Sequence, residues 1–229
     1  MRFRRALIVG AGAGLSASLA RRFAREGIAV ALAARRTDKL AALCAETGAS
    51  AHACDAADPA QVAALFATLD AQGAPDLVVY NASGRLRGPV ADLDPAEVQR
   101  SLQVSAFGAF LVAQQAARRM LPQHHGAIAL TGATAGVKGF ALSAPFAMGK
   151  FALRGLAQSL ARELMPQGIH VLHVVIDGGI RADQRPDPAD KPDSTLDPDA
   201  IADSYWHALT QHRSAWSWEI EVRPWVERF

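Results

Sequence analysis

The 229-residue sequence has few cysteines, little net charge and no long apolar segment. Its two cysteines, Cys44 and Cys54, cannot form a disulfide framework and have no nearby partners with metal-ligand spacing, so we expect a reducing cytoplasm and no metal site. A net charge of +2 favours neither nucleic acid nor an anionic membrane as a partner. No apolar run reaches membrane-spanning length, and the four apolar residues at 6–9 are too few for a signal peptide.

Short apolar segments alternate with amphipathic segments along the chain, and its length suits one domain spanning 1–229. Strands are expected at 6–9, 28–33, 50–54, 77–80, 128–131, 171–176 and 218–222. Helices are expected at 15–25, 38–46, 59–69, 95–120, 146–165 and 198–211, three of them opened by Asp-Pro pairs. The alternation predicts an α/β fold, a Rossmann-type doubly wound parallel sheet of about seven strands with helices on both faces. Ligands then bind beyond the carboxyl ends of the strands.

A glycine-rich stretch, Gly10-Ala11-Gly12-Ala13-Gly14, joins the first expected strand to the first expected helix. Glycines permit a tight turn and let backbone N–H groups approach a ligand, and the positive end of the helix points to the same place. This arrangement suits a pyrophosphate. The stretch predicts a dinucleotide site, with an ordinary glycine-rich turn as the alternative. The residues expected at the phosphates are Gly10, Gly12, Gly14, Leu15 and Ser16.

Two arginines, Arg35 and Arg36, follow the second expected strand, where a dinucleotide fold often carries an acidic residue for the ribose 2′-hydroxyl. Ala34 stands at that acidic position. A guanidinium grips a 2′-phosphate that a carboxylate would repel, so NADP(H) is favoured over NAD(H). The alternative is two solvated arginines.

Polar or small residues also follow the next two expected strands. Asp55 is placed to accept a hydrogen bond from an adenine amino group, with a simple turn aspartate as the alternative. Asn81 and Ala82 are small enough for a cofactor to lie against the backbone. The alternative for Asn81 is to brace the turn between neighbouring strands.

With these motifs, the chain resembles the short-chain dehydrogenase/reductase family from residue 7 to about residue 222. The resemblance also rests on Gly126-Ala127-Ile128 and on Lys150 with the residues that follow it; Ser16 replaces the usual third glycine. It implies a nicotinamide cofactor and a catalytic set of Asn, Ser, Tyr and Lys. In that set the tyrosine protonates the substrate oxygen, the lysine lowers the tyrosine pKa and binds the ribose, and the serine holds the oxygen.

The catalytic set implied by the resemblance is broken in this chain. Lys150 is present, but Phe146, Ala133 and Ser105 stand where tyrosine, serine and asparagine are expected. The usual Pro-Gly after the sixth strand reads Asp177-Gly178. The backbones of Gly178 and Ile180 could still meet the nicotinamide carboxamide.

Other groups could replace the missing hydroxyls. Ser143 lies seven residues before Lys150, the spacing that the working tyrosine has in the related enoyl reductases, although it could instead shape the loop. Thr134 is a candidate donor to the substrate oxygen. Lys150 could protonate a substrate if desolvated, but ribose binding is the preferred role. Phe146 is expected to form an apolar wall.

The segment 183–199 holds six aspartates and four prolines and follows the sixth expected strand. It cannot build a core, so we expect a mobile lid over the site, with a plain surface loop as the alternative. All four tryptophans lie in the last 24 residues, in a packing cluster or a subunit interface. The resemblance implies pairing of the long helices 95–120 and 146–165 between subunits, hence a homodimer or homotetramer.

Two functional hypotheses remain open. The first is an NADP(H)-dependent oxidoreductase acting on a small carbonyl, alcohol or related substrate through a non-standard active site. The second is a catalytically silent NADP(H)-binding protein that acts as a sensor or partner subunit. The glycine loop, Arg35 and Lys150 support cofactor binding in both, whereas Phe146, Ala133 and Ser105 favour the second.

Overall fold

The computed structural model describes residues 2–227 and confirms the predicted fold class. Seven parallel strands form one sheet in the order β3-β2-β1-β4-β5-β6-β7. The strands are β1 (Arg5–Val9), β2 (Ala29–Ala34), β3 (Ser50–Ala53), β4 (Leu77–Tyr80), β5 (Gly126–Thr131), β6 (Ile169–Ile176) and β7 (Glu219–Val222). The α-helices are α1 (Leu15–Arg25), α2 (Ala41–Thr47), α3 (Pro59–Asp70), α4 (Pro95–Leu102), α5 (Gly108–Met120), α6 (Ala144–Leu164) and α7 (Pro198–Leu209). Strand order reverses between β1 and β4, which is the switch point where such sheets bind ligands.

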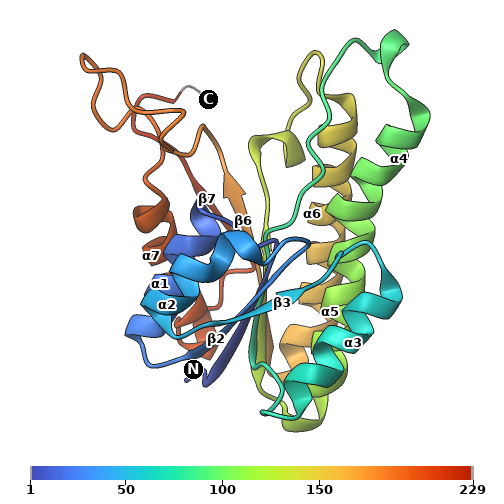
Figure 1. The fold of residues 1–229 in the computed structure, drawn as a ribbon, viewed down its shortest axis with the longest axis vertical. Helices are drawn as coiled ribbons and strands as arrows, with labels where there is room; N and C mark the ends of the chain where they lie inside the picture. Colours follow the sequence, from blue (N-terminus) through green and yellow to red (C-terminus); the bar gives the residue numbers. More distant parts are fainter. Residues whose placement is uncertain (1, 228–229) are drawn as a thin grey trace.

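Helices cover both faces of the sheet, with α1, α2 and α7 on one side and α3, α4, α5 and α6 on the other (Figure 1). The side chains of β1 alternate between two buried clusters: Ile8 packs on the side of α1 and α7, and Leu7 on the side of α3, α5 and α6. Every residue of β5 and β6 is buried, as expected for central parallel strands. The core therefore leaves only the ends of these strands for ligands.

The Asp-Pro pairs begin helices as the sequence predicts. Asp58 accepts hydrogen bonds from the backbone N–H groups of the first turn of α3, and Asp94 and Asp197 do the same at α4 and α7. The helix expected over 38–46 is different, because it begins as a 3-10 turn at Asp38–Leu40 before α2.

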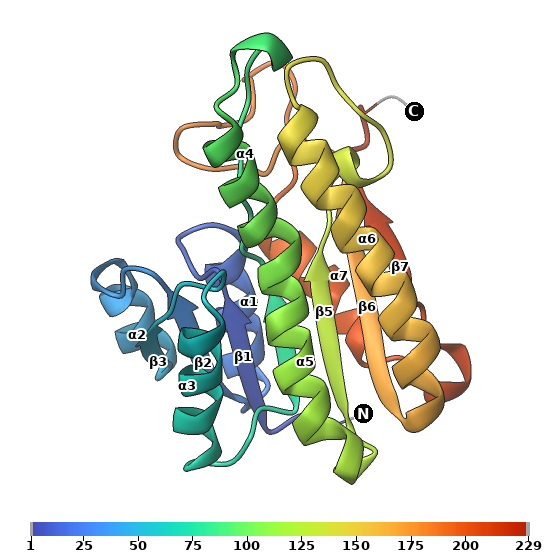
Figure 2. The same cartoon turned by 90° about the vertical axis from the view of Figure 1, so that its right-hand side faces the viewer.

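The long helix expected over 95–120 is interrupted by a π-helical turn, Gln103–Phe107, between α4 and α5 (Figure 2). Ser105 lies fully buried in this turn, and its Oγ accepts a hydrogen bond from the backbone N–H of Gly84 at 2.9 Å. A side chain at Gly149 of α6 would collide with Ser105, since its Cβ would lie 2.7 Å from the serine Cβ. The π turn thus ties α4 and α5 to α6 and to the loop after β4.

The segment 183–199 lies beyond the carboxyl end of β6 and is held at its base. Ile180 pairs with Leu196, and Arg181 forms ion pairs with Asp187, Asp193 and Asp197. Asp187 also accepts hydrogen bonds from the backbone N–H and the hydroxyl of Thr195. These bonds give the loop a defined internal structure despite its lack of apolar residues.

Candidate functional site

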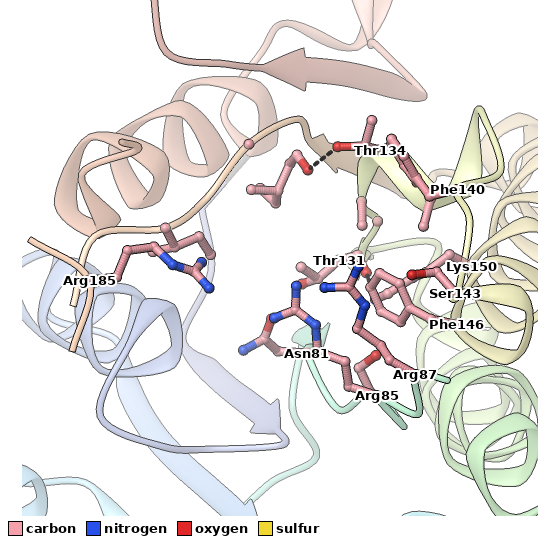
Figure 3. A pocket seen from close by; sticks show the side chains of 17 residues that line it. Asn81, Arg85, Arg87, Thr131, Thr134, Phe140, Ser143, Phe146, Lys150 and Arg185 are labelled. Atoms are coloured by element: carbon pink, nitrogen blue, oxygen red, sulfur yellow. Dashed lines mark hydrogen bonds between the residues drawn. The ribbon is translucent and has the colours of Figure 1, made fainter. Parts of the chain in front are cut away.

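Two cavities lie along the carboxyl edge of the sheet. One, of about 600 Å³, is lined by the glycine loop and by residues that follow β2, β3 and β4. The other, of about 430 Å³, is lined by residues that follow β4, β5 and β6 and by the start of α6 (Figure 3). Asn81 and Ser83 line both cavities, so the two cavities adjoin at the switch point, and together they are called the groove below.

The glycine loop has the geometry of a phosphate cradle. Gly10 has a φ of +87°, and a Cβ there would lie 2.4 Å from the backbone nitrogen of Ala82, so only glycine allows the close approach of the two loops. A Cβ at Gly12 or Gly14 would meet nothing within 4 Å and would occupy open space. No side chain caps the N-terminus of α1 at Gly14. The first turn therefore has no side-chain cap, and although the N–H of Ala17 donates to the carbonyl of Gly14, a pyrophosphate fits at this helix end.

Leu15 and Ser16, expected near the phosphates, and Asn81, expected beside the cofactor, have side chains that serve the fold. The Leu15 side chain is buried in the core, so only its backbone is available to a ligand. Ser16 Oγ donates to the carbonyl of Gly10 at 3.0 Å and accepts from Asn81 Nδ2 at 2.7 Å. The backbone N–H of Asn81 donates to Val9, so Asn81 links β4 to β1, which is the alternative role considered for it.

Arg35, Arg36 and Lys39 give the far end of the larger cavity a positive charge. Arg36 forms an ion pair with Asp38 at 2.8 Å, whereas Arg35 is exposed and has no ion pair with any residue within 2–227. Arg35 is therefore the better placed of the two to accept a 2′-phosphate. Sequence reasoning missed Lys39.

Asp55 lines the same cavity as Arg35, although its carboxylate already has two partners. One oxygen accepts from the backbone N–H of Ala57 at 3.1 Å, and the other lies 3.4 Å from Arg100. The hydrogen bond from Ala57 is a local contact of the kind that a turn aspartate makes, which is the alternative role considered for Asp55. Each oxygen retains a further lone pair for a ligand.

Lys150 projects from α6 to the edge of β5. Its ammonium donates to the carbonyl of Thr131 at 2.7 Å. Burial, helped by the nearby charge of Arg85, lowers the pKa of Lys150 to about 8. The Phe146 ring lies between two cations, with Lys150 Nζ at 5.9 Å and the Arg85 guanidinium carbon at 5.4 Å from its centre. Phe146 thus forms the expected apolar wall with no proton to give.

The expected substitute hydroxyls lie in the smaller cavity with Lys150. Thr134 Oγ1 donates to the carbonyl of Ile176 at 3.4 Å, a long bond that a ligand could replace (Figure 3). Ser143 is buried, and within residues 2–227 its hydroxyl has no hydrogen-bond partner. Ala133 contributes only a methyl group. Ser105 does not line the cavity, because it is bound to Gly84 inside the π turn.

Gly178 and Ile180, the residues considered for contact with a nicotinamide, line the smaller cavity beyond β6. Gly178 has a φ of +143°, and a Cβ there would lie 2.8 Å from Pro224. Asp177, in place of the usual proline, is buried and forms an ion pair with Arg223 at 3.2 Å. Its charge is therefore not available to the cavity.

Arg85, Arg87 and Arg185 also line the smaller cavity and were missed by sequence reasoning, as was Phe140. Arg85 and Arg87 follow Asn81-Ala82-Ser83-Gly84 directly, so the rule that ligands bind after strand ends could have found them. Nothing in the sequence distinguished Arg185 from the other charged residues of its segment as a residue of the cavity.

The chain is similar to known proteins over most of its length. The short chain dehydrogenase family model matches residues 4–188. A short-chain dehydrogenase from Rhodopseudomonas palustris is 34% identical, with a TM-score of 0.83 over 97% of this chain and 99% of its own. A metagenomic short-chain oxidoreductase in complex with NADP is 29% identical, with a TM-score of 0.83 over 96% and 97%. The cyclic-di-GMP-binding biofilm dispersal mediator protein of Escherichia coli (strain K12) is 32% identical over 79% of this chain and 74% of its own.

The chain belongs to the short-chain dehydrogenase family, a family of oxidoreductases that use a nicotinamide cofactor and act on small molecules. The resemblance seen in the sequence is thereby confirmed. Among residues 2–227, no helix is long and apolar enough to cross a membrane. The same residues contain no group of three or more His, Cys, Asp or Glu side chains arranged to hold a metal ion.

Proposed function

We propose that the protein is an NADP(H)-dependent oxidoreductase acting on a small carbonyl, alcohol or related substrate through a non-standard active site. The observation that carries the proposal is the groove that runs from Arg35, past the glycine cradle, to Lys150. Gly10, Gly12, Gly14 and the backbone of Leu15 and Ser16 would hold the pyrophosphate. Arg35, helped by Arg36, would hold the 2′-phosphate, and Asp55, Asn81 and Ala82 would border the adenine half.

A bound nicotinamide would supply or accept the hydride at the reacting carbon. Lys150 would hold the nicotinamide ribose, and Gly178 and Ile180 would face the carboxamide. Ser143 and Thr134, which line the same cavity as Lys150, would donate hydrogen bonds to the substrate oxygen. Without a tyrosine, proton delivery to that oxygen is less efficient, and a missing general acid typically costs 10²–10⁴ in rate.

The test is oxidation of NADPH, followed by absorbance, with a panel of aldehydes, ketones and enones. We expect slow turnover that falls further in Ser143→Ala and Thr134→Val, with Ser204→Ala as a control because Ser204 is on the surface of α7. Turnover that is unchanged in both cavity variants would contradict the assignment of the hydroxyls.

A silent NADP(H)-binding protein, acting as a sensor or partner subunit, is the second candidate. It is favoured by Phe146, which puts an apolar ring where the resemblance implies a proton donor. The Escherichia coli relative is named for binding a nucleotide. A wild type that binds NADPH tightly and oxidises it with no member of the panel would support this candidate over the first.

We propose a homodimer or homotetramer of single-domain subunits paired through the long helices, in the cytoplasm. Phe107, Phe110, Met148 and Phe151 are exposed large apolar residues at α5 and α6 or in the π turn, which supports pairing there. The tryptophans mostly favour packing within the chain: Trp206 contacts Phe3 and Phe23, and Trp216 stacks on His170 at 4.7 Å. Trp225 is exposed. Light scattering should give a mass of at least two chains.

The segment 183–199 is proposed as a substrate lid. Its base is fixed beside β6 by the pairing of Ile180 with Leu196, and Arg185 reaches from it into the cavity. Hydrogen exchange in this segment should slow when cofactor and substrate bind together. Unchanged exchange would favour a plain surface loop.

A further inference from the structure

The smaller cavity is unusually cationic for a site that acts on a carbonyl group. Arg85 and Arg87 enter it from the loop after β4, and Arg185 enters from the other side, on the segment after β6 (Figure 3). Lys150 adds a fourth basic group at its base. None of the 17 residues that line the cavity is an aspartate or glutamate. The cavity therefore holds positive charge with no anion to match it.

The three arginines lack acidic partners even where acids are near in sequence. Within residues 2–227, none of the three forms an ion pair. The contrast with Arg181 is sharp, because this arginine lies four residues before Arg185 and pairs with three aspartates of the same segment. Six aspartates in 183–199 were available to Arg185, yet its side chain lines the cavity instead.

Contacts with neighbouring residues fix the position of Arg185. Its backbone exchanges two hydrogen bonds with Ala182, which fixes a tight turn. A Cβ at Gly179 would lie 3.1 Å from the Cδ and from a guanidinium nitrogen of Arg185, so the glycine leaves the space over which this side chain passes. The loop thus directs the guanidinium toward the cavity rather than toward its own carboxylates.

Arg85 is held on the opposite side of the cavity. Its guanidinium carbon lies 5.4 Å from the centre of the Phe146 ring, a cation–π distance that leaves N–H donors free. Like charges gathered without a counter-charge repel one another, and an anion placed among them relieves that repulsion. Phe140, Phe146, Ile176 and Ile180 provide apolar walls beside the arginines.

We propose that the substrate carries an oxyanion, a carboxylate or a phosphate, on an apolar body, and that Arg85, Arg87 and Arg185 bind this group. The inference rests on the proposed function, because it places the anion in the same cavity as Lys150. The cofactor phosphates would lie in the larger cavity, at the glycine cradle and Arg35, under the proposed function. Arg185 belongs to the proposed lid, so the anion would also hold this segment over the site.

The test measures binding by calorimetry in the presence of saturating NADP⁺, which cannot reduce the keto group of a probe. The probes are benzoylformate, its uncharged methyl ester and phenyl phosphate. Charge-assisted hydrogen bonds predict that at least one anion binds at least about tenfold more tightly than the ester. The preferred anion identifies the group. Equal binding of the ester and both anions would overturn the inference.

Substitutions of the three arginines test whether these side chains cause the preference for the anion. Arg85→Gln, Arg87→Gln and Arg185→Gln should each reduce the preference for the anion, and the triple variant should abolish it. Arg213→Gln is the matched control, because Arg213 is exposed and precedes β7 at the other end of the sheet. A preference retained in the triple variant would place anion recognition elsewhere and overturn the inference.

Cofactor binding is measured separately for every variant, so that the two proposals can fail independently. If the triple variant loses NADPH affinity to the same extent as anion affinity, the arginines serve the cofactor and the inference is wrong while the proposed function stands. If the wild type binds the anion through these arginines but binds no NADPH, the proposed function falls and the anion site remains.

Discussion

The ammonium of Lys150 lies 5.9 Å from the centre of the Phe146 ring, one helical turn earlier on α6. The lysine is fully buried and bonded to the carbonyl of Thr131, so it keeps its position without a hydroxyl at residue 146. The groove therefore contains Lys150, which the resemblance assigns to the catalytic set, with no tyrosine hydroxyl at residue 146 for it to assist. What the protein can do depends on whether other groups replace that acid.

Phe146→Tyr should increase carbonyl reduction. The new hydroxyl would lie near Lys150, whose positive charge stabilises a phenolate and so lowers the tyrosine pKa. We expect at least a tenfold rise in kcat for NADPH oxidation, with about 10²–10⁴-fold as the full contribution typical of a general acid. Phe140→Tyr is the matched control, because Phe140 lines the same cavity but lies against Lys138. Equal gains in both variants, or none, would contradict the account.

Lys150→Met should stabilise the fold at neutral pH, and the gain should shrink in alkali. Burial lowers the pKa of Lys150 from 10.5 to about 8, so between these values the unfolded chain binds a proton that the native protein has released. The wild type therefore gains stability as pH rises through this window. At pH 7 the variant avoids a penalty of up to about 3 kcal/mol. Denaturant unfolding of both proteins at pH 7 and pH 10 measures the difference; a constant difference would refute the prediction.

Gly10→Ala and Gly12→Ala should separate folding from cofactor binding. At Gly10 the added methyl would meet the backbone of Ala82 at a positive φ, so we expect a loss of about 1–3 kcal/mol in stability. At Gly12 the methyl enters open space, so the fold should be unchanged while NADPH binding weakens. Thermal unfolding and fluorescence titration distinguish the two. Full NADPH affinity in Gly12→Ala would argue against the phosphate cradle.

Local chemistry made most of the fold predictable. The strands of the sheet centre are apolar because they are buried on both faces, and Asp-Pro pairs mark helix starts by bonds within a few residues. The π turn was not predictable, because it depends on the contact of Ser105 with Gly84, 21 residues away, and with Gly149 on another helix. The helical segment expected from residue 38 does begin there, but its first three residues form a 3-10 turn, so α2 itself begins three residues later.

The candidate site was only partly predictable for the same reason. Lys150, Phe146 and Ser143 lie at or near the start of α6, so their spacing in the sequence was enough to predict that they lie close together. The inward orientation of Arg185 depends on the turn at Ala182 and the space above Gly179, neither of which a charge pattern reveals. Leu15 and Ser16 were expected at the phosphates, but their side chains serve the core and the loop.

A dinucleotide with a 2′-phosphate is the ligand proposed for the groove, and a comparison of NADPH with NADH tests this. Titration by tryptophan fluorescence should show tighter binding of NADPH to the wild type. Arg35→Gln should weaken NADPH binding by about 10- to 100-fold and leave NADH unchanged, because only NADPH loses a charge-assisted contact. Arg118→Gln, on the exposed face of α5, is the control. Equal or tighter binding of NADH to the wild type would contradict the account.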